Sequence, residues 1–185
     1  MPTTLKVAIQ GDPASFHEIA AKKYYQQPIE LLYCQTFQDT FNQLTNGTAD
    51  RAFVATSNSA HGEITEVSSL LQQTQLYTEG YYTLPIEQHL IGLPGTSIAN
   101  LTTVISHPVA LSQCDSYLTT TLAHTQLQTY YDTSAAIEYV KKSANASIAA
   151  VGSDAAAQLH GLEILQSSIH NDPHNSTVFG SFKSQ

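Results

Sequence analysis

The sequence predicts an α/β fold in which the chain forms two lobes. Short apolar stretches of strand length alternate with stretches whose apolar residues recur at helical spacing, a pattern typical of helices packed on mainly parallel sheets. Two polar segments, near residues 79–83 and 167–176, interrupt this alternation. We therefore expect lobe 1 to comprise about 1–80 plus 170–185, lobe 2 to comprise about 81–169, and a ligand to bind in the cleft between them.

In the first half of the chain, strand, loop and helix follow one another. The apolar strand at residues 6–10 leads into Gly11, and Ser15 is placed to cap an amphipathic helix through its hydroxyl oxygen. The further elements predicted here are a helix with Phe37, Phe41 and Leu44 that ends at Gly47, a strand at 52–55, and a helix with Ile64, Val67, Leu70 and Leu71.

The second half continues the alternation after a tyrosine-rich passage at residues 77–82. Strand-like and helix-like segments again take turns, which supports the same fold class. The predicted strands are 89–91, 104–105, 127–131, 147–151 and 177–182, and the predicted helices are 109–118, 134–142 and 153–159.

The composition excludes several classes of partner. Only 12% of the residues are charged, the formal net charge is −8, and the seven basic residues are six lysines and Arg51. Without a cluster of basic residues, no nucleic-acid partner is expected. No apolar stretch approaches the ~20 residues of a membrane helix, and the N-terminus lacks the features of a secretory signal. We therefore expect a cytoplasmic protein without a membrane partner.

The cysteines and histidines do not indicate a metal centre or a cofactor. Cys34 and Cys114 lack C-x-x-C spacing, which favours two buried thiols over a disulfide or a metal pair. Among eight histidines, only His170 and His174 form a close pair. Phosphate-loop, dinucleotide and zinc-helix motifs are absent from the sequence. We predict no metal site and no cofactor.

Polar residues gather at the ends of predicted strands, where α/β sheets present their sites. A cluster of hydroxyls and amides near helix N-termini suits a small anionic ligand that is rich in oxygen. For each residue taken alone, helix capping or turn formation is the alternative. The segments are Ser15, residues 57–59 with Gly62, residues 106–108, residues 133–134 and residues 175–177.

Five segments match, in order, the motifs of one known family. Residues 11–17 are similar to Gly-Pro-x-Gly-Thr-Phe-Ser, and residues 47–50 with 54–62 are similar to Gly-x-Ala-Asp followed by Val-Pro-x-Glu-Asn-Ser-x-x-Gly. Residues 106–114 match Ser-His-Pro-x-Ala-Leu-x-Gln-Cys without a break, and two later motifs are matched by residues 132–136 and 150–165. The chain therefore resembles the catalytic domain of prephenate dehydratases over nearly its whole length.

The resemblance implies a two-lobed α/β fold of the periplasmic-binding-protein type (type II), with prephenate bound in the interlobe cleft. No segment of the 185 residues corresponds to the regulatory ACT domain that is common in this family, so control by phenylalanine is not expected. Members of the family often form dimers or tetramers, which makes a homodimer possible.

Two positions depart from the family pattern. Val178 stands where Asn-x-Thr-Arg-Phe has arginine, and Ser57 stands where the family has glutamate. Loss of the ring hydroxyl needs a delivered proton, and a threonine hydroxyl needs a cation or a hydrogen-bond network beside it to serve this purpose. The absence of this arginine and this glutamate favours a related reaction. The chain looks like the stand-alone prephenate decarboxylases of bacilysin-type and aeruginosin-type pathways, which release CO2 without aromatising the ring and give dihydro-4-hydroxyphenylpyruvate.

Two alternatives stay open: a phenylpyruvate-forming prephenate dehydratase, and a module that binds small anions without catalysis. The proton donor is open among His107, His17 and His61. The resemblance implies catalytic roles for Thr177, Ser106, His107 and Asn58, and substrate-binding roles for Ser15, Phe16, Ser57, Ser59, Gln113, Ser134 and Phe179.

Overall fold

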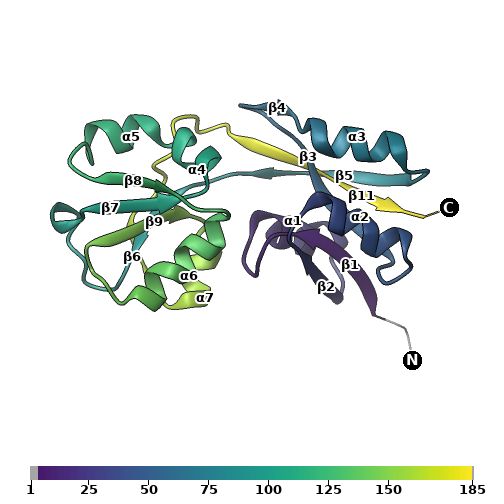
Figure 1. Cartoon of the computed structure of the whole chain (residues 1–185), viewed down its shortest axis with the longest axis horizontal. Helices are drawn as coiled ribbons and strands as arrows, with labels where there is room; N and C mark the ends of the chain where they lie inside the picture. The colour runs from purple at the N-terminus through teal and green to yellow at the C-terminus, as the bar shows by residue number, and fades with distance from the viewer. Residues whose placement is uncertain (1–3, 185) are drawn as a thin grey trace. The chain divides into compact units, whose positions relative to one another are not determined.

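The computed structural model describes residues 4–184 and divides the chain into two compact units (Figure 1). Residues up to Ile86 and from His174 onward form unit 1, and residues 87–173 form unit 2. The chain thus passes from one unit to the other twice, at positions a few residues later than the sequence pattern suggested. Each unit has its own sheet and its own hydrophobic cores.

Unit 1 is built on a mixed sheet. Three strands in it are parallel, whereas β11 runs antiparallel to both of its neighbours, β3 and β5. In spatial order the strands are β2 (Ile29–Cys34), β1 (Leu5–Gln10), β3 (Arg51–Asn58), β11 (Ser176–Lys183) and β5 (Tyr77–Pro85), and the short β4 (Gly62–Glu63) pairs with β3.

The helices of unit 1 bury different faces of this sheet. Side chains of β3 alternate between two cores, because successive residues of a strand point to opposite faces. Phe53 and Ala55 join the core that contains residues of α1 (Phe16–Tyr25). Ala52 and Val54 join the core that contains residues of α2 (Phe37–Thr45) and α3 (Thr65–Gln73).

Unit 2 is also an α/β unit, built on a five-stranded sheet. Its strands, in spatial order, are β10 (Glu163–Gln166), β6 (His89–Gly92), β9 (Ile148–Gly152), β7 (Thr103–Ser106) and β8 (Gln126–Thr129). Its helices are α4 (Pro108–Gln113), α5 (Asp115–Thr120), α6 (Thr133–Ser143) and α7 (Asp154–His160), with a 3-10 turn, η1 (Ile98–Asn100).

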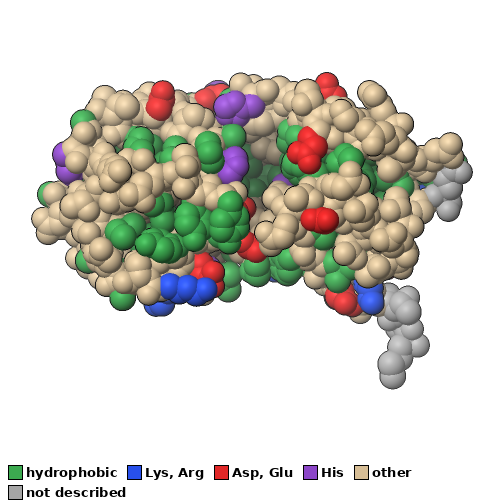
Figure 2. Space-filling model, viewed as in Figure 1, with side chains coloured by type: hydrophobic (Ala, Val, Ile, Leu, Met, Phe, Trp, Pro, Cys, Tyr) green, Lys and Arg blue, Asp and Glu red, His purple; other side chains and the backbone are tan. Residues whose placement is uncertain are grey.

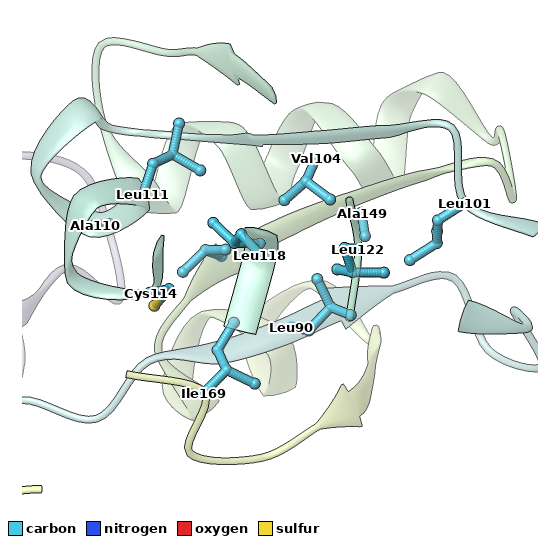
Figure 3. Close-up of a cluster of buried hydrophobic side chains, with 11 residues drawn as sticks. Leu90, Leu101, Val104, Ala110, Leu111, Cys114, Leu118, Leu122, Ala149 and Ile169 are labelled. Carbon is cyan, nitrogen blue, oxygen red and sulfur yellow. The ribbon is translucent and has the colours of Figure 1, made fainter. Parts of the chain in front are cut away.

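One core of unit 2 lies between this sheet and the helices α4 and α5 (Figure 3). Leu90 from β6 and Val104 from β7 meet Leu118 from α5 there, and all three side chains are almost fully buried. Cys114 belongs to the same core, and Cys34 is buried in unit 1; neither forms a disulfide. The prediction of two buried thiols is confirmed.

Several elements differ from the sequence prediction. Strands β2, β5 and β10 were not predicted, and the helix expected at residues 109–118 is two short helices that meet at Cys114. Both sheets are mixed rather than mainly parallel, because β11 and β6 run antiparallel to their neighbours.

The surface follows the composition. On the face seen in Figure 2, Lys and Arg side chains are scarce. None of the helices in residues 4–184 is long and apolar enough to cross a bilayer.

Candidate functional site

Asn58, Asn175 and Thr177 form a hydrogen-bonded cluster in unit 1, where the end of β3 pairs with the start of β11. Asn58 and Thr177 are direct partners in the register of these two strands. The Asn58 Nδ2 atom lies 3.0 Å from Thr177 Oγ1 and 3.0 Å from Asn175 Oδ1. It also lies 3.1 Å from the Ser176 carbonyl oxygen. A single amide group therefore reaches three acceptors on β11 and the residue before it.

The turn between β3 and β4 fixes the direction of the Asn58 amide. Its Oδ1 atom accepts hydrogen bonds from the backbone N–H groups of Ala60, at 2.9 Å, and His61, at 3.2 Å. A backbone N–H can only donate, so the oxygen must face the turn and the NH2 group must face β11. Ser59 adds to this anchoring, since its Oγ atom accepts from Ser176 N–H at 2.9 Å.

The hydroxyl of Thr177 is left with a hydrogen to donate. Its oxygen accepts from Asn58, and within residues 4–184 this hydroxyl donates no hydrogen bond. The side chain is half-buried, and Phe179, two residues further along β11, is fully buried and stacks on Phe53 at a centroid distance of 5.6 Å. The strand therefore holds Thr177 beside a rigid aromatic core and leaves its proton available to a ligand.

His17 is part of this core. Its Nε2 atom accepts a hydrogen bond from the Ala55 N–H at 3.1 Å, and its ring meets Phe179 edge to face at 5.0 Å. Burial lowers the pKa of His17 to about 3, so the imidazole is neutral near pH 7. A neutral ring whose Nε2 lone pair is already engaged does not supply an imidazolium proton, and His17 loses support as the proton donor.

Ser57 and Val178, the two departures from the family pattern, face each other across β3 and β11. Because side chains alternate along a strand, both point to the opposite face of the sheet from Asn58 and Thr177. Thr56 is skipped in the strand register at this point, and its hydroxyl donates to the Val178 carbonyl at 3.1 Å. The two substitutions therefore occur at one cross-strand pair, away from the Thr177 hydroxyl.

Ser15 and Phe16 lie at the start of α1. Ser15 is buried, and its Oγ atom accepts from the Glu18 N–H at 3.4 Å, as expected for the N-cap. Phe16 packs against the core that contains Phe179. Both residues thus have structural roles in the folded chain, and their role in binding a substrate stays a prediction.

Ser106 and His107 lie in unit 2, at the end of β7. The buried Ser106 hydroxyl donates to the Val151 carbonyl of β9 at 2.7 Å, so its oxygen is left only as an acceptor. His107 caps α4: its Nδ1 atom accepts from the Val109 N–H at 3.2 Å, which places the hydrogen of the neutral ring on Nε2. Burial lowers the pKa of His107, so the neutral form dominates near pH 7.

Gln113 and Ser134 are also in unit 2. The Gln113 Oε1 atom accepts from the side chain of Gln88 at 3.3 Å. The N–H of the buried Ser134 donates to the Asp132 carboxylate at 2.8 Å, which caps α6. The structure joins Asn58 to Thr177 directly, and Ser59 is linked to this pair through Asn175 and Ser176.

Asn175 is the residue that sequence reasoning left without a role. It belongs to the polar segment 175–177, but only the direction of the neighbouring Asn58 amide reveals its place in the cluster. The available signal was its position two residues before Thr177, inside the Asn-x-Thr motif.

The comparisons with known proteins give the family of this chain. The sequence profile of the family described as prephenate dehydratase matches residues 7–185. The chain belongs to the prephenate dehydratase family. The match includes β3 and β11, and therefore Thr177 and both departures at positions 57 and 178.

Curated members of the prephenate dehydratase family are similar over most of this chain. Arogenate dehydratase 1 of Petunia hybrida is 38% identical over 177 residues, which cover 96% of this chain and 42% of that protein. The bifunctional chorismate mutase/prephenate dehydratase of Escherichia coli (strain K12) is 34% identical over 181 residues, 96% of this chain and 47% of that enzyme. The chain thus spans less than half the length of these relatives.

Solved structures confirm the predicted fold class. The prephenate dehydratase of Arthrobacter aurescens, in complex with L-Phe, has a TM-score of 0.88 at 21% identity, over 98% of this chain and 61% of that one. A chain described as GqqA, a novel type of quorum quenching acylase, has a TM-score of 0.84 at 29% identity, over 97% and 64%. A ligand-binding component of an ABC-type import system from Staphylococcus aureus reaches 0.50 at 12% identity, over 96% and 65%.

Proposed function

We propose that this chain is a lyase that acts on prephenate, or on its amino counterpart arogenate, and that it removes the ring hydroxyl with the help of Thr177. One observation carries the proposal. The Thr177 oxygen accepts a hydrogen bond from the fixed amide of Asn58, so the hydroxyl hydrogen is free to donate to a leaving oxygen. Members of the family that are named as dehydratases of prephenate and of arogenate support this choice.

The chemistry needs this donor. In dehydration, the bond to the ring carboxylate breaks, CO2 leaves, its electron pair enters the ring, and the ring hydroxyl departs as the ring becomes aromatic. Hydroxide is a poor leaving group, and a hydrogen bond from Thr177 stabilises the charge that develops on its oxygen. The proton that completes water is passed on by this hydroxyl, which regains a proton from solvent, and the organic product is phenylpyruvate from prephenate.

A non-aromatising prephenate decarboxylase is the second candidate, and the neutral pair Ser57 and Val178 favours it. Here CO2 leaves, the electron pair moves through the diene, and a proton adds to a ring carbon while the hydroxyl stays. The product is dihydro-4-hydroxyphenylpyruvate. The family pattern has glutamate and arginine at these two positions, and their loss argues against the proton delivery that dehydration needs. A homodimer and a cytoplasmic location stay predictions from the sequence.

One assay separates the candidates. The purified chain is incubated with prephenate and, in parallel, with arogenate, and the products are identified by mass spectrometry and ultraviolet absorbance. Loss of CO2 and water together, with the absorbance of phenylpyruvate, supports the dehydratase. Loss of CO2 alone supports the decarboxylase and overturns the leading proposal. Binding without turnover identifies a binding module and overturns both.

A further inference from the structure

The amide nitrogen of Asn175 is a donor that lacks a partner. The residue is 3% exposed, and no hydrogen-bond acceptor lies within reach of its Nδ2 atom among residues 4–184. Folded proteins leave few buried donors unpaired, and each such group calls for a water, an ion or a ligand.

The direction of this amide is fixed by its neighbour. Because the Asn58 oxygen faces the backbone N–H groups of Ala60 and His61, the Asn58 NH2 group must face Asn175. Turning the Asn175 amide over would set two NH2 groups against each other. The Asn175 oxygen therefore stays toward Asn58, where Ser59 Oγ also lies at 3.5 Å, and its NH2 group stays on the other side.

The backbone around Asn175 gives the side chain little freedom to move. Its carbonyl oxygen accepts from the Ile86 N–H at 2.8 Å. The next residue, Ser176, exchanges two hydrogen bonds with Ser59, both at 2.9 Å. The unpaired donor is therefore held rigidly, and an acceptor has to come to it.

We propose that Asn175 is a substrate-binding residue whose NH2 group donates to a carbonyl or carboxylate oxygen of the bound acid. The inference rests on the proposed function and deepens it, because the same Asn58 amide orients both Asn175 and Thr177. One donor holds an oxygen of the substrate while the other serves the leaving hydroxyl. Asn58 is then a positioning residue for both.

The test compares two variants that lose the donor in different ways. Asn175→Asp keeps an acceptor for Asn58, whereas Asn175→Leu keeps the residue neutral and similar in size. Both are expected to raise KM for prephenate about 10- to 100-fold, the usual worth of one hydrogen bond to a charged group. Asn46→Asp, at the exposed end of α2, is the control for the added charge and should leave KM unchanged. Unchanged KM in a folded Asn175→Asp variant would overturn the proposal and assign the donor to a water.

A second measurement keeps the proposal testable if turnover is absent. The side-chain NH2 signals of Asn175 in the ¹⁵N-labelled wild-type chain are assigned by their loss in Asn175→Asp, and they are then followed during titration with prephenate, arogenate and phenylpyruvate. A saturable shift of these signals with one of the acids supports the proposal, even if the lyase assay fails. The absence of a shift with all three acids overturns it.

Discussion

The donor role that we propose for Thr177 depends on one neighbouring side chain. Asn58, on the adjacent strand, donates a hydrogen bond to the Thr177 hydroxyl oxygen. The hydroxyl hydrogen must therefore point away from Asn58. A residue that is weakly acidic in water thus acquires a defined orientation, which is the property that a donor to a leaving oxygen requires.

Replacing Thr177 by valine should therefore abolish most of the turnover. Valine keeps the shape of the side chain and removes the hydroxyl, and loss of one such donor typically lowers kcat by about 10²- to 10³-fold. Thr177→Ser retains the hydroxyl and should keep most of the rate. Steady-state kinetics on prephenate check both variants. Equal rates for valine and wild type would exclude the hydroxyl from the reaction.

His17 should make the stability of the chain fall in mild acid. The folded chain keeps this imidazole neutral down to about pH 3, whereas the unfolded chain takes up the proton near its ordinary pKa of 6.5. Between these two pH values the unfolded state therefore binds more protons than the folded state, and the free energy of unfolding decreases as the pH falls. The contribution is fully present above pH 6.5 and is progressively lost below it.

The comparison with His17→Gln isolates this effect. Glutamine also offers an acceptor to the Ala55 N–H but does not titrate. Between about pH 7.5 and pH 5, wild type should lose up to about 2 kcal/mol more unfolding free energy than the variant. Urea denaturation at both pH values measures the difference, and the other histidines cancel because both proteins carry them. Parallel losses in the two proteins would show that His17 titrates normally in the folded state.

At the scale of elements, the pairing of β3 with β11 couples positions 57 and 178. Ser57 lies between Val178 on β11 and Glu63 on β4, with all three in one row across the sheet. Val178 in turn lies opposite Thr83 of β5. An arginine introduced at position 178 alone would lie between two neutral residues, Ser57 and Thr83. If position 57 were changed to glutamate as well, the two opposite charges would face each other.

Val178→Arg and Ser57→Glu should therefore be less destabilising together than the sum of the single changes. Opposite charges directly across two strands contribute about 0.2–1 kcal/mol. A double-mutant cycle in urea, at low and high salt, measures the coupling, and Glu63→Gln in the same background removes the competing carboxylate. Strictly additive effects would contradict the shared row.

Val178→Arg alone is not expected to restore strong dehydration, because Ser57 also stands where the family has glutamate.

The elements that the sequence predicted share a clear period. The helix with Phe37, Phe41 and Leu44 ends near Gly47, which has the positive φ of +73° that favours glycine. By contrast, β5 has little alternation to detect, since it lies at an edge and most of its residues, including Tyr77 and Tyr81, are exposed. Local periodicity therefore found the buried elements and missed β2, β5 and β10 at sheet edges, whereas β8, which is also an edge strand, was predicted.

The site was predictable in its residue types but not in its geometry. The motifs singled out Asn58 and Thr177, and the structure joins these two side chains. Placing Val178 on the other face requires the strand register and the skipped Thr56, which arise from pairing between distant segments. The direction of the unpaired Asn175 NH2 group depends on the orientation of Asn58, which the turn between β3 and β4 fixes.

At the scale of the whole molecule, unit 2 is a continuous stretch with its own sheet and core. Residues 87–173 made as a separate chain should therefore fold. We expect a dispersed NMR spectrum and cooperative unfolding in urea, with Leu118→Ala costing about 2–5 kcal/mol because that side chain is buried in the core. A chain that unfolds without cooperativity would show that unit 2 depends on unit 1.

The two ends of unit 2 are hydrogen-bonded neighbours, and this has a consequence for the order of folding. Ile169 N–H donates to the Gln88 carbonyl at 2.9 Å, and next to them Ile86 N–H donates to the Asn175 carbonyl at 2.8 Å. Asn58 and Thr177 are 119 positions apart, so an unfolded chain must close a long loop to join them. Once unit 2 has folded, residues 87–173 no longer count toward this loop, and closing it costs about 1 kcal/mol less. We therefore expect unit 2 to form first, and the hydroxyl of Thr177 to gain its orientation as one of the last events of folding.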